Sequence, residues 1–129
     1  MLQKGSDMAR PVVHFEITGK DARKLQDFYG KLFDWKIDAD NPMSYGMVEA
    51  GEGGIGGGIA ATDDGSAGWV TFYVEVDDLQ AHLARAESLG GKTIVPVTTV
   101  PGMVTFALLA DPEGHVIGLV KSEDHEHSH

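Results

Sequence analysis

The 129-residue sequence has no cysteine, which excludes disulfide bonds and thiolate metal sites. It also lacks an apolar run approaching about 18 residues, so no membrane-spanning helix is expected. Basic residues are scarce, with 10 Lys and Arg against 20 Asp and Glu, for a formal net charge of −10. An acidic surface repels phosphate backbones and the sequence shows no basic stripe, so nucleic-acid binding is not expected.

The beginning of the sequence shows no basic region leading into an apolar stretch, so we expect no secretory signal. Together with the acidic composition, this favours a cytoplasmic protein. The length predicts a single domain, which we place at residues 11–121. We expect residues 1–10 to be an N-terminal extension and residues 122–129 to be a disordered, His-rich tail that can pick up metal adventitiously.

The first half of the chain predicts a strand, a helix and three further strands. Residues 12–18 alternate, which places Val13, Phe15 and Ile17 on one face of a strand and His14, Glu16 and Thr18 on the other. Asp21 is the expected start of a helix that turns one apolar stripe to the core. The stripe comprises Leu25, Phe28, Tyr29, Leu32 and Phe33.

Two strands are expected near 35–37 and 44–49, followed by a segment with six glycines between Gly51 and Gly58. A phosphate-binding loop would need a strand before it and a helix after it, and no helix pattern follows. We therefore predict a hairpin turn leading into a Gly-rich strand whose backbone another group approaches closely.

The second half repeats this pattern after a shift of 57 residues, which carries His14 onto Thr71 and Asp21 onto Asp78. Residues 70–76 alternate, with Val70, Phe72, Val74 and Val76 predicted on the helix side. A helix follows Asp78, and strands are expected near 92–98, 103–109 and 115–121, the last two joined by an Asp-Pro-Glu-Gly turn. The sequence thus predicts two βαβββ repeats, at about 11–61 and 69–121.

Several segments resemble the vicinal-oxygen-chelate superfamily, which includes glyoxalase I, bleomycin-resistance proteins and extradiol dioxygenases. They are Val-His-Phe-Glu-Ile at 13–17, Asp-Phe-Tyr at 27–29, Val-Asp-Asp-Leu at 76–79 and Asp-Pro-Glu-Gly at 111–114. The resemblance implies an α+β fold in which two βαβββ repeats form a curved, cup-like mixed sheet with the helices outside. It also implies a small-molecule site and a homodimer.

In metal-binding members, four positions on the first and last strands of the repeats supply ligands. The resemblance places these at His14, Thr71, Gly118 and the Gly56–Gly58 segment. Only His14 is a good ligand type, whereas catalytic metal sites normally have three protein ligands. We therefore expect no metal cofactor. The alternative is a metal-dependent lyase or dioxygenase in which His14 acts with Glu16 or Glu75.

Our preferred interpretation is a metal-free binding protein, similar to the bleomycin-resistance branch, that encloses a small organic ligand. A third hypothesis is a regulatory protein with a vestigial cavity. Aromatic and methionine side chains suit a flat organic ligand, and no catalytic residue is assigned. The candidate ligand-binding residues are His14, Glu16, Trp35, Tyr45, Met47, Thr71, Tyr73, Glu75, Met103 and Gly118.

Overall fold

The computed structural model describes residues 9–122, so most of the predicted N-terminal extension and nearly all of the His-rich tail lie outside the described residues. Contacts divide the chain into two compact units. Val13–Tyr73 forms what we call the first unit, and the described residues on either side of it form the second. In residues 9–122, no helix is long and apolar enough to cross a membrane.

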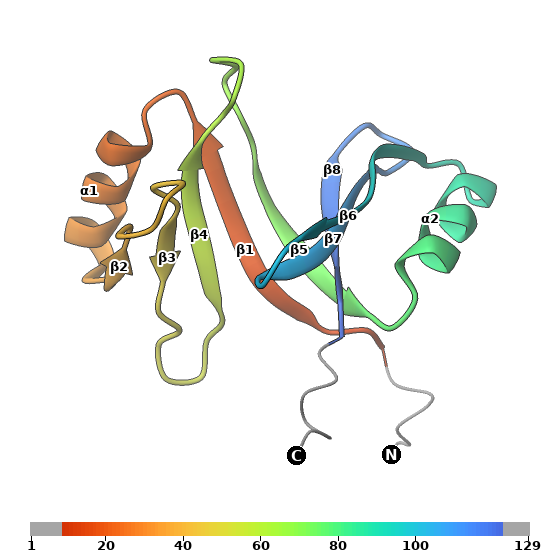
Figure 1. Ribbon diagram of the computed structural model, residues 1–129, viewed down its shortest axis with the longest axis horizontal. Coiled ribbons are helices and arrows are strands. Elements are labelled where there is room, and N and C mark those ends of the chain that lie inside the picture. The colour runs from red at the N-terminus through yellow and green to blue at the C-terminus, as the bar shows by residue number, and fades with distance from the viewer. Residues whose placement is uncertain (1–8, 123–129) are drawn as a thin grey trace. The chain divides into compact units, whose positions relative to one another are not determined.

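The described residues form two helices and a mixed sheet of eight strands, which confirms the predicted α+β fold. The repeated βαβββ order of the elements is also confirmed (Figure 1). In chain order the elements are β1 (Val12–Gly19), α1 (Ala22–Phe33), β2 (Ile37–Asp38), β3 (Gly46–Val48), β4 (Gly56–Ala61), β5 (Val70–Val76), α2 (Leu79–Ser88), β6 (Lys92–Val100), β7 (Val104–Ala110) and β8 (Val116–Lys121).

The first unit has the strand order β2-β3-β4-β1, with β5 next to β1. β1 and β4 are parallel, and Glu16 is the partner of Gly58 in their register. β3 and β4 are antiparallel, and Met47 is also a partner of Gly58. Because partnered residues point to the same face of a sheet, Met47, Gly58 and Glu16 form one row across three strands.

In the second unit the order β6-β7-β8, with β5 next to β8, repeats the order seen in the first unit. β7 and β8 are antiparallel and are joined by the predicted turn. Asp111 closes this turn, because its carboxylate accepts hydrogen bonds from the backbone N–H groups of Glu113 and His115, both at 2.9 Å. Gly114 takes a positive φ of 93°, which explains the glycine there.

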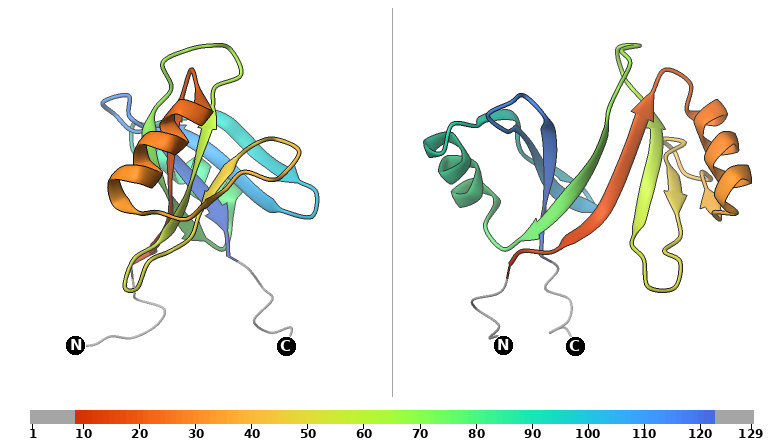
Figure 2. Two further views of the ribbon diagram at one scale, coloured as in Figure 1. Left: turned by 90° about the vertical axis from the view of Figure 1, so that its left-hand side faces the viewer. Right: turned by 180° about the vertical axis from the view of Figure 1, so that it is seen from behind.

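Both helices begin where the sequence predicted. The Asp21 carboxylate accepts a hydrogen bond from the Lys24 N–H at 3.1 Å, and the Asp78 carboxylate accepts one from the Ala81 N–H at 3.0 Å. Each aspartate thereby satisfies an N–H group that has no partner within the helix. α1 packs on β4 in the first unit, and α2 packs on β6 in the second (Figure 2).

Each unit has its own hydrophobic core. In the first unit Ile17, Val48 and Ile59 are buried, and partly buried aromatic side chains pack around them. In the second unit the buried side chains that pack together as a core are Val76, Leu79, Leu83, Ala107 and Leu119. The faces predicted for β1 are confirmed, because Phe15 and Ile17 belong to the core of the first unit.

The prediction that the whole apolar stripe of α1 faces the core is wrong. Leu25 and Tyr29 pack against the core of the first unit, but Phe28, Leu32 and Phe33 remain 56%, 57% and 51% exposed. The stripe is wider than the line of contact between a short helix and the sheet, so only one edge of it is covered. The other edge is an exposed apolar patch.

The helix-side face predicted for β5 is only half correct. Val74 and Val76 pack in the core of the second unit, whereas Val70 is 75% exposed and Phe72 is 40% exposed. Val70 and Phe72 belong to the first unit, in which α1 packs on β4. A strand can thus alternate cleanly even where no helix covers its apolar face.

Candidate functional site

The polar face of β1 carries a cluster of hydrogen-bonded side chains centred on Glu16. Its Oε1 atom accepts hydrogen bonds from the Tyr73 hydroxyl at 3.0 Å and from the indole N–H of Trp69 at 3.1 Å. Its Oε2 atom accepts one from the Tyr45 hydroxyl at 3.1 Å. Both carboxylate oxygens are therefore held by neutral donors, all from the first unit.

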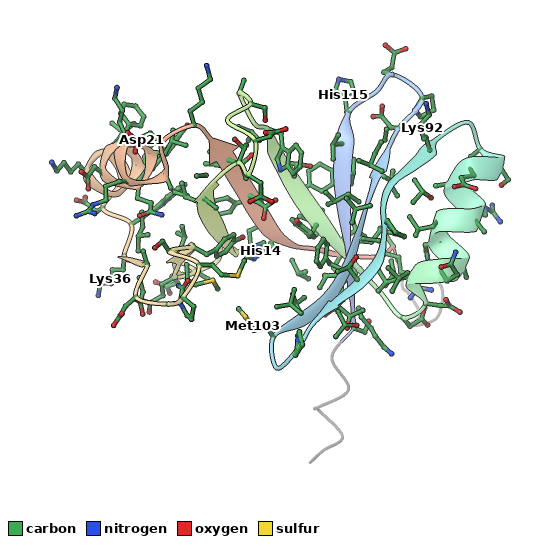
Figure 3. All side chains as sticks on the ribbon, turned by 45° about the horizontal axis from the view of Figure 1, so that its top comes forward. His14, Asp21, Lys36, Lys92, Met103 and His115 are labelled. Atoms are coloured by element: carbon green, nitrogen blue, oxygen red, sulfur yellow. The ribbon has the colours of Figure 1, made fainter. Side chains whose placement is uncertain are left out.

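His14, which is labelled in Figure 3, extends the cluster by one hydrogen bond. Its Nε2 lies 3.1 Å from the Tyr45 hydroxyl oxygen, and its ring makes an edge-on contact with the Tyr73 ring at a centroid distance of 5.6 Å. Tyr73 thus forms both a hydrogen bond and a ring contact within this group of side chains. We call His14, Glu16, Tyr45, Trp69 and Tyr73 the Glu16 cluster.

Asn41 and Gly58 hold Tyr45 in place. Asn41 accepts a hydrogen bond from the Tyr45 N–H at 3.0 Å and donates one to the Tyr45 carbonyl at 2.8 Å. The Tyr45 hydroxyl end also lies directly over Gly58, where any Cβ atom would overlap it. On the opposite face, the Phe15 ring lies over Gly57. These contacts explain the Gly-rich strand β4, whose close approach by other groups was predicted from the sequence.

Burial and the Glu16 carboxylate set the electrostatics of the cluster. Burial raises the pKa of Tyr45 and Tyr73 well above the usual value, and both the charge of Glu16 and its hydrogen bonds add to this shift. Burial lowers the pKa of His14, although the nearby Glu16 carboxylate opposes the change. The two hydroxyl groups therefore stay protonated, and the neutral form of the imidazole is favoured.

The structure brings four of the predicted site residues together in the cluster, namely His14, Glu16, Tyr45 and Tyr73. Trp69 was missed, although a tryptophan directly before a strand needs a partner for its indole N–H. Trp69 reaches the cluster because its backbone N–H donates to the Thr18 hydroxyl at 3.0 Å and its carbonyl accepts from the Thr18 N–H at 2.8 Å. These contacts fix the residue beside β1.

The other candidates in the first unit lie elsewhere. Trp35 packs on Phe15 beside the hydrophobic core at a ring centroid distance of 5.2 Å. Met47 is 45% exposed and shares its row with Glu16. It also lines an open depression of about 320 Å³ between β2 and β3. Thr71 is only 6% exposed.

Three candidates belong to the second unit. The Glu75 backbone N–H donates a hydrogen bond to the Pro11 carbonyl at 2.9 Å. Met103 is 62% exposed at the turn between β6 and β7 (Figure 3), and it lines a second open depression of about 290 Å³. Gly118 is buried in β8, where it pairs with Leu108.

Among the four positions that the resemblance assigns to metal ligands, only His14 carries a side chain that binds metals well. His14 Nε2 already lies at hydrogen-bond distance from Tyr45, and both oxygens of Glu16 accept hydrogen bonds. Gly118 and the Gly56–Gly58 segment offer no side-chain donor. In residues 9–122, no group of three His, Asp or Glu side chains is placed to hold an ion.

Residues 14–120 match the family model for the glyoxalase-like domain. Among curated proteins, CFP32 of Mycobacterium bovis, whose name marks it provisionally as a glyoxylase, is 31% identical over 79 residues. That match covers 61% of this chain but only 30% of CFP32. A glyoxylase-like domain-containing protein of Didymella fabae is 28% identical over 108 residues, covering 78% of this chain and 84% of that protein.

Solved structures support the same fold. Methylmalonyl-CoA epimerase from Mycobacterium tuberculosis superposes with a TM-score of 0.66 at 14% identity, covering 98% of this chain and 100% of the epimerase. A glyoxalase/bleomycin resistance protein/dioxygenase superfamily member from Vibrio splendidus gives a TM-score of 0.60 at 14% identity, covering 88% and 100% of the two chains. At these identities the structures establish the fold and leave the reaction open.

Proposed function

This chain belongs to the glyoxalase-like domain family, and on that premise we propose that it binds a small organic molecule at the Glu16 cluster without a metal cofactor. The observation that carries the proposal is the set of three neutral donors on the Glu16 carboxylate. They give the polar face of β1 a fixed arrangement of a carboxylate, an imidazole and aromatic rings. Such a combination of apolar rings with a few oriented polar atoms is typical of small-molecule sites.

A metal-dependent lyase or dioxygenase is the weaker interpretation. A metal held by His14 and Glu16 would share the carboxylate with hydroxyl groups that it binds at 3.0 Å and 3.1 Å. It would still lack a third protein ligand, because Thr71 is a poor donor and position 118 is a glycine. The donor set therefore favours binding over metal chemistry.

Ligand and metal binding are tested together on purified protein. We expect a small-molecule thermal-shift screen to find compounds that raise the Tm, because selective binding to the native state stabilises it. We expect elemental analysis of protein ending at Ser122, which removes the three histidines of the tail, to show no stoichiometric Mn, Fe, Co, Ni or Zn. One tightly bound metal per truncated chain, lost in His14→Ala, would restore the enzyme hypothesis. A screen without any stabilising compound would favour a vestigial cavity.

We further propose that the chain forms a homodimer through the exposed apolar patch of α1. The patch consists of Phe28, Leu32 and Phe33, each more than half exposed, and exposed apolar patches commonly mark protein interfaces. Sedimentation should show a dimer at micromolar concentration. Leu32→Lys should weaken it at least about tenfold, since a buried charge without a partner disfavours association.

A matched control for the dimer is Leu89→Lys, because Leu89 is 65% exposed and lies at the end of α2. This variant introduces the same charge on the other helix and should leave the dimer intact. A monomeric wild type, or a dimer that tolerates Leu32→Lys, would contradict the proposal.

A further inference from the structure

The side-chain N–H and O–H groups of the Glu16 cluster all donate their hydrogens within the cluster. Tyr45, Tyr73 and Trp69 each donate to the Glu16 carboxylate. A hydroxyl group has one hydrogen, and that of Tyr45 is given to Glu16, so the contact between Tyr45 and His14 requires His14 Nε2 to be the donor. This assigns the neutral His14 to the tautomer that carries its proton on Nε2.

The cluster can therefore offer a ligand hydrogen-bond acceptors and aromatic ring faces. The His14 Nδ1 atom has a free lone pair in this tautomer, and the carboxylate oxygens have room for about four hydrogen bonds, of which three are made. Tyrosine rings present an electron-rich face that attracts cations. No N–H or O–H group of these side chains remains to bind an anion.

The charge of Glu16 also lacks a cationic partner within the described part of the chain. The ion pairs found in residues 9–122 join Arg10 to Asp77 and His115 to Asp111, and neither pair includes Glu16. His14 does not supply the missing charge, since burial lowers its pKa and favours the neutral form. A half-buried carboxylate with only neutral donors around it is complementary to a positive charge.

We propose that the site takes organic cations, with an ammonium or amidinium group at Glu16 and an attached ring against the partly exposed Tyr45 side chain, because Tyr73 is only 9% exposed. The proposal rests on the proposed function and specifies its ligand class. It predicts that carboxylates and phosphates of similar size are rejected, because they would face the Glu16 carboxylate with no donor to offset the repulsion. The net charge of −10 adds a long-range attraction for cations.

Three compounds with one ring and different charge test this directly on the full chain: benzylamine, benzyl alcohol and benzoate. NMR titration can follow the indole N–H signal of Trp69, which reports on the cluster because it donates to Glu16. We expect benzylammonium to bind at least about tenfold more tightly than benzyl alcohol, a difference of about 1.4 kcal/mol, and benzoate to cause no shift. Tighter or equal binding of benzoate would overturn the proposal without any variant.

The matched variants Glu16→Gln and Glu52→Gln separate the effect of the charge at the site on cation binding from the effect of the overall net charge. Both remove one negative charge, but Glu52 is exposed in the turn before β4. We expect Glu16→Gln to lose the preference for the cation and Glu52→Gln to keep it. Equal effects would refute a local site. If the thermal-shift screen finds only neutral or anionic ligands, the cation proposal fails and the binding function stands, whereas no ligand in either experiment rejects both.

Discussion

Replacing Gly58 by alanine is expected to displace the Tyr45 ring and break the Glu16 cluster. An added Cβ atom would overlap the Tyr45 hydroxyl end, and β4 has little freedom to move because Gly58 is paired with Glu16 on one side and Met47 on the other. Tyr45 must then leave, which breaks its contacts with Glu16 and His14. Overpacking of this kind typically lowers the free energy of unfolding by about 1–3 kcal/mol, and ligand binding should be lost.

Alkaline titration of the tyrosine absorbance gives a direct readout. Burial and Glu16 raise the pKa of Tyr45 in the native protein, so native Tyr45 should remain protonated above pH 10, where an ordinary tyrosine ionises. The stabilisation linked to this shift is fully present below about pH 10 and is lost as the pH rises further. In Gly58→Ala, Tyr45 leaves the cluster and its pKa should fall toward the ordinary value, so one more tyrosine should ionise near pH 10.

Two other glycines serve as controls. Gly51→Ala adds a methyl group with nothing within 4 Å, so stability and titration should not change. Gly57→Ala would place a Cβ atom 2.5 Å from the Phe15 ring on the core face. It should lower stability while leaving the tyrosine titration of the native protein unchanged. Unaltered titration in Gly58→Ala would show that Tyr45 is not held as described.

The structural features that depend on residues close together in the sequence were the most predictable. The caps Asp21 and Asp78 act on N–H groups three residues away, and the turn closed by Asp111 is equally local. The alternation in β1 correctly assigned Phe15 and Ile17 to the core because one face of this strand is covered. The 57-residue repeat then predicted the order of the remaining elements.

Contacts between distant segments were harder to predict. Trp69 is 53 residues from Glu16 in sequence, and nothing in its local pattern indicates which strand it lies beside. Trp35 precedes a strand of only two residues, so alternation could not assign its face. The partly exposed stripe of α1 shows a further limit, since periodicity identifies an apolar face but does not say how much of it the sheet covers.

The 57-residue repeat also relates two residues of the Glu16 cluster to each other. The same 57-residue shift carries Glu16 onto Tyr73, and these two side chains are hydrogen-bonded to each other at 3.0 Å. They occupy corresponding positions on β1 and β5, the first strands of the two repeats. Corresponding positions on paired first strands can therefore meet, which places side chains from both repeats in one cluster. This explains how Tyr73 comes to support a carboxylate of the other repeat.

Glu16→Ala is expected to be strongly destabilising, even though it removes a half-buried charge. The substitution leaves the hydroxyl groups of Tyr45 and Tyr73 and the indole N–H of Trp69 without their acceptor. A fully buried unpaired donor costs roughly 1–3 kcal/mol, and water can reach partly exposed ones, so the total loss should be about 2–4 kcal/mol. Relief of carboxylate desolvation opposes this, but the three hydrogen bonds already offset most of that penalty.

Urea denaturation of Glu16→Ala, Glu16→Gln and Glu75→Ala tests this cost. Gln keeps one oxygen acceptor for Tyr73 and Trp69, so Glu16→Gln should lose less stability than Glu16→Ala. Glu75→Ala removes the other candidate carboxylate on the predicted polar face, and the contact that Glu75 makes with Pro11 is through its backbone N–H, so stability should change by less than about 0.5 kcal/mol. If Glu16→Ala were as stable as Glu75→Ala, the three donors would not depend on Glu16, and both the proposed ligand site and its preference for cations would lose their structural basis.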